Sequence, residues 1–193
     1  TYLSATALAV SSMTPVCLFS YENRIESIRK YVNILGGVYD LANKKPDPTK
    51  VNVIVMKSCE DAETASGYVS TGNLPYKTYI HDSITQFNYW NAFGANFQDT
   101  SKAMSFGSWK KPEYKEWMAA LNNTRILVDW WKNLPDTNVI FTANVRDVPS
   151  ETNKALKVIA PLIYPESGPE LVMGILDYVF YLQSNSSGKR ELI

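Results

Sequence analysis

Short runs of apolar residues recur along the chain, and longer stretches in which apolar residues follow helical spacing lie between them. A short, nearly unbroken apolar run predicts a strand that is buried on both faces, as in a parallel sheet. We expect such strands at 15–22, 51–56, 76–82, 138–144 and 177–183. Helical spacing predicts helices at 1–12, 24–35, 60–69 and 109–131.

This alternation of strands and helices predicts an α/β fold, with a mostly parallel sheet and helices on both of its faces. A turn at 185–188 and a return strand over 189–193 predict a terminal β-hairpin. Residues 149–169 carry four prolines and many polar residues, which predicts a long loop with few apolar anchors. The aromatic and amide-rich segment 86–106 has no pattern that predicts a helix or a strand, and one interpretation of residues 86–111 is an insertion of unknown purpose.

Composition sets limits on the class of protein. The chain has 193 residues, 45% of them hydrophobic, and a formal net charge of zero, which predicts a single soluble domain over 1–193 without a bulk attraction to nucleic acid. Two cysteines and one histidine are too few for a metal-ligand cluster and predict reduced, buried thiols. No apolar run is long enough to span a membrane, so we expect a cytoplasmic protein with no membrane partner.

The strand around Ile80 ends in Asp82, followed by the hydroxyl residues Ser83 and Thr85. In an α/β sheet, ligands bind beside the carboxyl ends of the parallel strands, so Asp82 is expected in a ligand crevice. An aspartate at this place is suited to hold the magnesium that bridges nucleotide phosphates. The alternative is an aspartate that caps the following helix.

Polar residues end two other predicted strands: Glu22 is the last residue of the strand at 15–22, and Asn144 is the last residue of the strand at 138–144. The order of Glu22, Asp82 with Ser83, Asn144, a long loop and a terminal hairpin resembles the RecA-like P-loop ATPase core. It resembles in particular the phage RecA-like proteins of single-strand annealing and recombination. The resemblance extends over nearly the whole chain and implies ATP and Mg²⁺ as ligands.

In that family, a helix such as 1–12 directly follows the phosphate-binding loop G-x-x-x-x-G-K-[ST]. The sequence begins within the predicted helix and contains no such loop, so we expect the loop to precede Thr1. The resemblance then implies that the hydroxyl of Thr1 binds Mg²⁺ together with Asp82, and that Ser83 lies at the nucleotide.

The resemblance also assigns roles to four other residues. Glu22 orients or deprotonates the attacking water, and Asn144 senses the γ-phosphate. Lys189 and Arg190, on the terminal hairpin, offer cations to the phosphates bound by a neighbouring subunit. Each has a simpler reading: an acid that interacts with a helix dipole for Glu22, a turn amide for Asn144, and solvated charges for the two cations.

The segment 146–169 occupies the position at which RecA-like proteins contact single-stranded DNA. Its cations Arg146, Lys154 and Lys157 are the expected DNA ligands, although nearby acids balance them. Single-strand grooves combine cations with stacking aromatics, and Tyr164 is the aromatic residue on this segment.

From the sequence we therefore expect a homo-oligomeric ATPase of DNA recombination or annealing, located in the cytoplasm, which is the host cytoplasm if a phage encodes it. The alternative is a non-catalytic phage assembly or structural module that keeps the fold without nucleotide hydrolysis. A small-molecule kinase would need an arginine-rich lid, and residues 86–106 contain no arginine.

Overall fold

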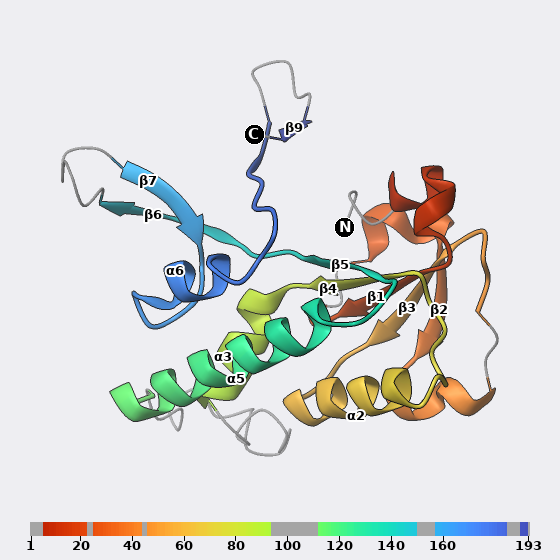
Figure 1. The fold of residues 1–193 in the computed structure, drawn as a ribbon, viewed down its shortest axis with the longest axis horizontal. Coiled ribbons are helices and arrows are strands. Elements are labelled where there is room, and N and C mark those ends of the chain that lie inside the picture. The colour runs from red at the N-terminus through yellow and green to blue at the C-terminus, as the bar shows by residue number, and fades with distance from the viewer. Residues whose placement is uncertain are drawn as a thin grey trace.

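A computed structural model describes residues 6–22, 25–43, 46–93, 112–149, 157–184 and 190–192. Its centre is a five-stranded sheet in the order β2-β3-β1-β4-β5, and all four pairings between neighbouring strands are parallel (Figure 1). The strands are β1 (Val16–Ser20), β2 (Val32–Gly36), β3 (Val51–Val55), β4 (Thr78–Asp82) and β5 (Asn138–Phe141). The predicted α/β class with a parallel sheet is thus confirmed.

Strand β1 lies in the middle of the sheet, and all five of its residues are buried. Its side chains alternate between two apolar clusters. Cys17 and Phe19 belong to the cluster on one face, whereas Val16 and Leu18 belong to the cluster on the other. The unbroken apolar run in the sequence therefore reflects a strand that is covered on both faces.

The two faces have different covers. Helices α2 (Cys59–Ser70), α3 (Ile84–Phe93) and α5 (Tyr114–Lys132) lie on one side of the sheet in Figure 1. On the other face, buried residues of short 3₁₀ segments, including Ala7 and Ile28, pack against β1, β3 and β4. The 3₁₀ segments in the described residues are η1 (Ala7–Ala9), η2 (Ser11–Met13), η3 (Glu26–Tyr31) and η4 (Val38–Asn43), and Val38 of η4 belongs to the cluster on the helical face.

The helix ends follow local signals in the sequence. Ser58 caps α2 by accepting a 3.3 Å hydrogen bond from the backbone N–H of Asp61. Glu113 and Glu116 form a reciprocal capping box at the start of α5, which begins at Tyr114. The prediction of a helix at 109–131 is confirmed from Tyr114 onward, and its first residues, 109–111, lie outside the described residues.

Two helix predictions near the N-terminus were wrong. The described part of 24–35 forms η3 and then strand β2, because the extended run from Val32 pairs with β3. Helical spacing at Ile25, Ile28 and Tyr31 covers too short a segment to outweigh that pairing. In the described part of 1–12, η1 and η2 stand where one continuous helix was expected.

Residues 149–169 were predicted as a long loop, and this was also wrong for their described part, since residues 150–156 lie outside the described residues. The described part contributes to an antiparallel hairpin of β6 (Val145–Pro149) and β7 (Lys157–Pro161), followed by α6 (Gly168–Met173). Ile163 is fully buried in a cluster with Ile84, Leu121 and Val128, which anchors the segment after β7 to the helical layer.

At the C-terminal end, strands β8 (Leu182–Ser184) and β9 (Arg190–Leu192) pair antiparallel, which confirms the terminal hairpin. The expected strand at 177–183 is shorter than predicted, since residues 178–181 are not in a strand. None of the helices in the described part of the chain has the length and hydropathy needed to cross a membrane.

Candidate active site at the carboxyl edge of the sheet

The carboxyl ends of β1, β4 and β5 bring Glu22, Asp82 and Asn144 to one edge of the sheet. Ser20 of β1 is in register with Asp82 of β4, and His81 of β4 is in register with Phe141 of β5. Backbone hydrogen bonds continue past the strand ends, since the N–H of Tyr21 donates to the carbonyl of Asp82 at 2.8 Å. The convergence expected from parallel strands is therefore observed.

Glu22 lies between two neutral donors that come from the other two strand ends. Its Oε1 atom accepts a 2.5 Å hydrogen bond from the hydroxyl of Ser83 and a 3.3 Å hydrogen bond from the side-chain amide of Asn144. Glu22 is half-buried and Ser83 is buried. These contacts fix the orientation of a carboxylate that solvent can still reach.

Asp82 has a different partner. Its Oδ1 atom accepts a 2.6 Å hydrogen bond from the hydroxyl of Thr142, which follows β5. The cap of α3 comes from the next residue, because the hydroxyl of Ser83 accepts from the backbone N–H of Gln86 at 3.4 Å. The carboxylate of Asp82 is thus held at the edge of the sheet, and the helix-cap role belongs to Ser83.

Asn144 is held through its backbone as well as its side chain. Its N–H donates to the hydroxyl of the buried Thr85 at 3.0 Å, and its carbonyl accepts from the N–H of Leu162 at 2.6 Å. The side-chain amide donates to Glu22 across the sheet, which differs from a turn amide that bonds its own backbone.

Sequence reasoning missed Thr142 as a partner of Asp82 and Thr85 as a partner of Asn144. Both are hydroxyl residues at the end of an apolar run, so the signal was present in the sequence. The pairing could not be derived from it, because the register of β4 against β5 decides which hydroxyl meets which group.

The donor set fits a magnesium ion that is held mainly by phosphates. Mg²⁺ bound with nucleotides takes one or two carboxylates and keeps several waters. Asp82 supplies such a carboxylate at a half-buried position. The described residues contain no group of three or more His, Cys, Asp or Glu side chains that could hold a metal ion.

Some of the other predicted ligands lie in the described part of the chain and some lie outside it. Thr1, Lys154 and Lys189 lie outside the described residues, so their predicted roles stay predictions. Lys157 is the first residue of β7 and Arg190 the first of β9, which places both on hairpin backbones.

Arg146 of β6 is engaged within the protein. Its guanidinium lies 5.4 Å from the ring centroid of Tyr164, and Nη2 donates to the carbonyl of Glu166 at 3.1 Å. Tyr164 contacts the rings of Trp117 and Tyr89, with centroids 5.0 and 5.7 Å away. Arg146 therefore anchors the hairpin to an aromatic cluster on α3 and α5.

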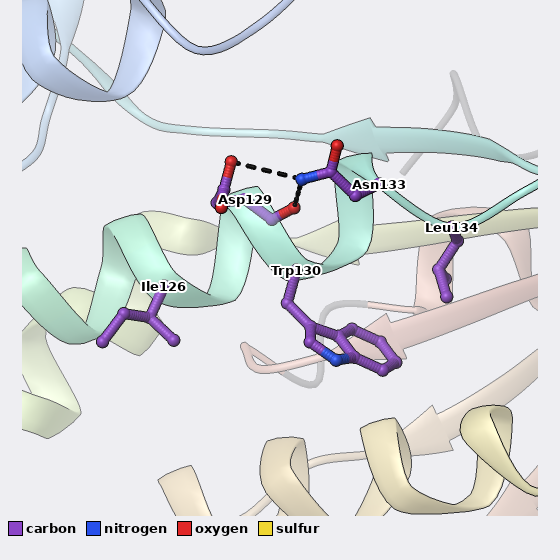
Figure 2. A pocket seen from close by; sticks show the side chains of 5 residues that line it. All are labelled: Ile126, Asp129, Trp130, Asn133 and Leu134. Atoms are coloured by element: carbon purple, nitrogen blue, oxygen red, sulfur yellow. Dashed lines mark hydrogen bonds between the residues drawn. The ribbon is translucent and has the colours of Figure 1, made fainter.

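A shallow pocket on α5 lies away from these carboxylates. Figure 2 shows its lining, in which the indole of Trp130 extends from α5 and Ile126 and Leu134 flank it. Its polar groups already bond each other, since the side-chain amide of Asn133 donates to the carbonyl of Asp129 at 2.7 Å and to its carboxylate at 3.3 Å. Leu134 precedes β5, so the pocket lies toward the amino edge of the sheet and is separate from the candidate active site.

Comparisons of this chain with protein families, with curated proteins and with solved structures found no match.

Proposed function

We propose that this protein is a RecA-type ATPase that hydrolyses ATP with Mg²⁺ at the carboxyl edge of its sheet. We propose further that it acts as a homo-oligomer on single-stranded DNA in recombination or annealing. The observation that carries the proposal is the contact of Glu22 with both Ser83 and Asn144, because it gathers a carboxylate, a hydroxyl and an amide from three strand ends.

In this proposal Glu22 acts on water. The water oxygen forms a bond to the γ-phosphorus as the bond between that phosphorus and the bridging oxygen of ADP breaks. Glu22 takes the proton of the water, and the products are ADP and inorganic phosphate. The hydroxyl of Ser83 keeps the Glu22 carboxylate in a fixed direction, which lowers the cost of positioning the water.

Asp82 is the proposed magnesium ligand. The hydroxyl of Thr142 holds its Oδ1 atom, so the carboxylate is oriented before any ligand binds. When bound, Mg²⁺ supplies positive charge to the phosphate oxygens. Asp82 therefore contributes to nucleotide binding as well as to turnover, whereas Glu22 contributes to turnover.

Asn144 is the proposed sensor of the γ-phosphate. Its amide donates to Glu22, and strand β6 begins at the next residue, Val145. A change in the partner of this amide would be passed directly to the β6–β7 hairpin, which carries Arg146 and Lys157. This continuity supports a coupling between the state of the bound nucleotide and the binding of DNA. Lys154, the third predicted DNA ligand, lies between β6 and β7 in the sequence.

The proposed oligomer uses the terminal hairpin. Strands β8 and β9 extend away from the sheet in Figure 1, and Arg190 is the first residue of β9. Lys189 directly precedes Arg190 in the sequence. Cations at this place can reach phosphates bound by a neighbouring subunit.

The test is ATP hydrolysis by the protein expressed from its full reading frame, with Mg²⁺ and single-stranded DNA. The substitution Glu22→Gln keeps the shape of the side chain, so nucleotide should still bind while turnover falls about 10²–10⁴-fold, the loss typical of a general base. Asp82→Ala should weaken Mg²⁺-nucleotide binding as well as turnover.

Glu26→Gln is the matched control, because Glu26 lies in η3 on the same segment and forms an exposed ion pair with Arg29. It should hydrolyse ATP at the parent rate. Equal hydrolysis by the parent and Glu22→Gln would show that Glu22 is a structural acid. A parent that neither binds nor hydrolyses ATP would favour the non-catalytic assembly module.

A further inference from the structure

Each candidate catalytic carboxylate is directly preceded by a buried aromatic residue, and these two residues are bonded to each other. Tyr21 precedes Glu22, and His81 precedes Asp82. The hydroxyl of Tyr21 lies 2.9 Å from Nδ1 of His81, at a distance of 60 residues along the chain. Tyr21 is 4% exposed and His81 is fully buried.

The surroundings leave the imidazole of His81 little freedom. The rings of Phe19, Trp131 and Phe141 surround it, with centroids at 4.9, 4.5 and 5.2 Å. Within the described part of the chain, Nε2 of His81 has no hydrogen-bond partner. The contact with Tyr21 is therefore the one hydrogen bond that the structure gives to this ring.

Both partners are neutral at physiological pH. Burial lowers the pKa of His81 to about 3. Burial, with smaller contributions from Cys59 and Asp61, raises the pKa of Tyr21 well above its ordinary value. The contact is thus a neutral hydrogen bond in an apolar environment, where its direction is well defined and its loss leaves an unpaired polar group.

We propose that Tyr21 and His81 are positioning residues that fix the Glu22 carboxylate relative to the Asp82 carboxylate. The side-chain bond and the backbone bond from the N–H of Tyr21 to the carbonyl of Asp82 together tie the ends of β1 and β4. This inference rests on the proposed role of the two carboxylates in hydrolysis. Misplacement of reacting groups by about 1 Å can cost about 10²-fold in rate, so such a tie has a measurable effect.

The first test compares Tyr21→Phe with Tyr79→Phe. Both tyrosines are buried in the same apolar cluster, and each substitution removes one hydroxyl. The hydroxyl of Tyr79 donates to the carbonyl of Leu74 and accepts from the N–H of Tyr76, away from the carboxylates. The two variants therefore share the chemical change and differ in whether the lost bond adjoins the site.

We expect Tyr21→Phe to lower kcat for ATP hydrolysis about 10- to 100-fold with an unchanged Kd for Mg²⁺-ATP. Tyr79→Phe should keep the parent kcat. Equal kcat values for these two variants, in a parent for which Glu22→Gln abolishes hydrolysis, would overturn the positioning role and leave the proposed function standing.

The double variant Tyr21→Phe/His81→Phe separates positioning from stability. Replacing both partners by apolar rings removes the unpaired polar group, so thermal stability should recover relative to Tyr21→Phe. We expect kcat to remain low, because the directional bond is still absent. Recovery of kcat together with stability would overturn the inference, and this variant also serves if Tyr21→Phe alone fails to fold.

A structural readout keeps the test independent of hydrolysis. If the parent does not hydrolyse ATP, the proposed function fails, and crystal structures of the two single variants then decide the inference. The contact between Glu22 and Ser83 should be displaced in Tyr21→Phe and kept in Tyr79→Phe. A contact retained in both variants would overturn it.

Discussion

The side-chain amide of Asn144 donates a 3.3 Å hydrogen bond to the carboxylate of Glu22, although 122 residues separate them in the chain. Strands β1 and β5 are not neighbours, since β4 lies between them. The bond therefore spans the end of β4 and passes over the segment that carries Asp82 and Ser83. A substitution or a ligand that moves one of these side chains should therefore also move the others.

Removal of this bond should reduce turnover. Asn144→Ala deletes one positioned donor at the proposed site, and the loss of such a donor typically costs about 10²-fold in kcat. Nucleotide affinity should stay near the parent value, because Asp82 is unchanged. Steady-state hydrolysis and nucleotide titration measure both quantities.

Asn138→Ala is the matched control for this experiment. Asn138 is the first residue of β5, the strand that leads to Asn144, and its amide donates to the hydroxyl of Thr78 at 3.3 Å. It should hydrolyse ATP like the parent. Equal kcat values for the two alanine variants would contradict a role for Asn144 in turnover.

The strand ends could be predicted from the sequence because they depend on local patterns. Apolar runs that stop at Glu22, Asp82 and a polar amide were sufficient to place three groups at one edge, once the strands were taken as parallel. The contacts among these groups depend on strand order and register. They needed the structure, as did the bond between Tyr21 and His81.

Strand β2 could not be predicted for a similar reason. Ile25, Ile28 and Tyr31 follow helical spacing, and Val32 continues this spacing in the sequence. The partner of Val32 is Val51 of β3, a residue that local periodicity cannot identify. Pairing across the sheet outweighs a short helical pattern.

The buried face of α5 gives a stability prediction. Ile126 and Leu127 are adjacent apolar residues of α5, but Ile126 is 65% exposed and Leu127 is 7% exposed. Leu127→Ala should therefore lower the free energy of unfolding by about 2–5 kcal/mol. Ile126→Ala should change it by no more than about 0.5 kcal/mol.

Chemical denaturation of the two variants measures this difference, and each variant is the control for the other. Both substitutions make the same kind of change at adjacent positions of one helix. A larger loss for Ile126→Ala would mean that the helix is rotated relative to the structure described above.

The thiol of Cys59 should react slowly in the native protein. Burial, followed by the charges of Glu60, Glu63 and Asp61, raises its pKa to about 12. At pH 8 its thiolate fraction is then roughly a thousandfold below that of a free cysteine, and the thiolate is the reactive form. Alkylation rates between pH 7 and 10, followed by peptide mapping, test this expectation against the unfolded protein.

The sign of the pH effect on stability follows from the same shift. An unfolded Cys59 ionises near its ordinary pKa, whereas the folded thiol stays neutral until about pH 12. Its contribution to stability is complete below the ordinary pKa and is lost as the pH rises toward 12. Cys59→Ser should reduce this loss of stability. An unchanged alkaline unfolding profile would contradict the raised pKa of Cys59 in the folded protein.

The β6–β7 hairpin gives the prediction on DNA. Lys157 begins β7, while Arg146 of β6 is already engaged with Tyr164 and Glu166. Arg146→Ala is therefore expected to loosen the hairpin as well as remove a charge. Lys157→Ala is the cleaner test of a contact to phosphate.

We expect Lys157→Ala to weaken binding to single-stranded DNA by a similar factor for every sequence, because a phosphate contact does not distinguish bases. Each phosphate contact contributes about 0.7 to the slope of log K against log salt concentration for single strands. The variant should therefore show a slope smaller in magnitude by about 0.7. Fluorescence anisotropy with labelled oligonucleotides measures this slope between about 50 and 200 mM salt, because phosphate contacts lose much of their effect over that range. Lys50→Ala is the control, since Lys50 directly precedes β3 at the amino edge of the sheet and pairs with Asp47 at 3.8 Å. If both lysine variants keep the parent slope, Lys157 contacts no phosphate, and this result would contradict the proposed DNA-binding role of the hairpin.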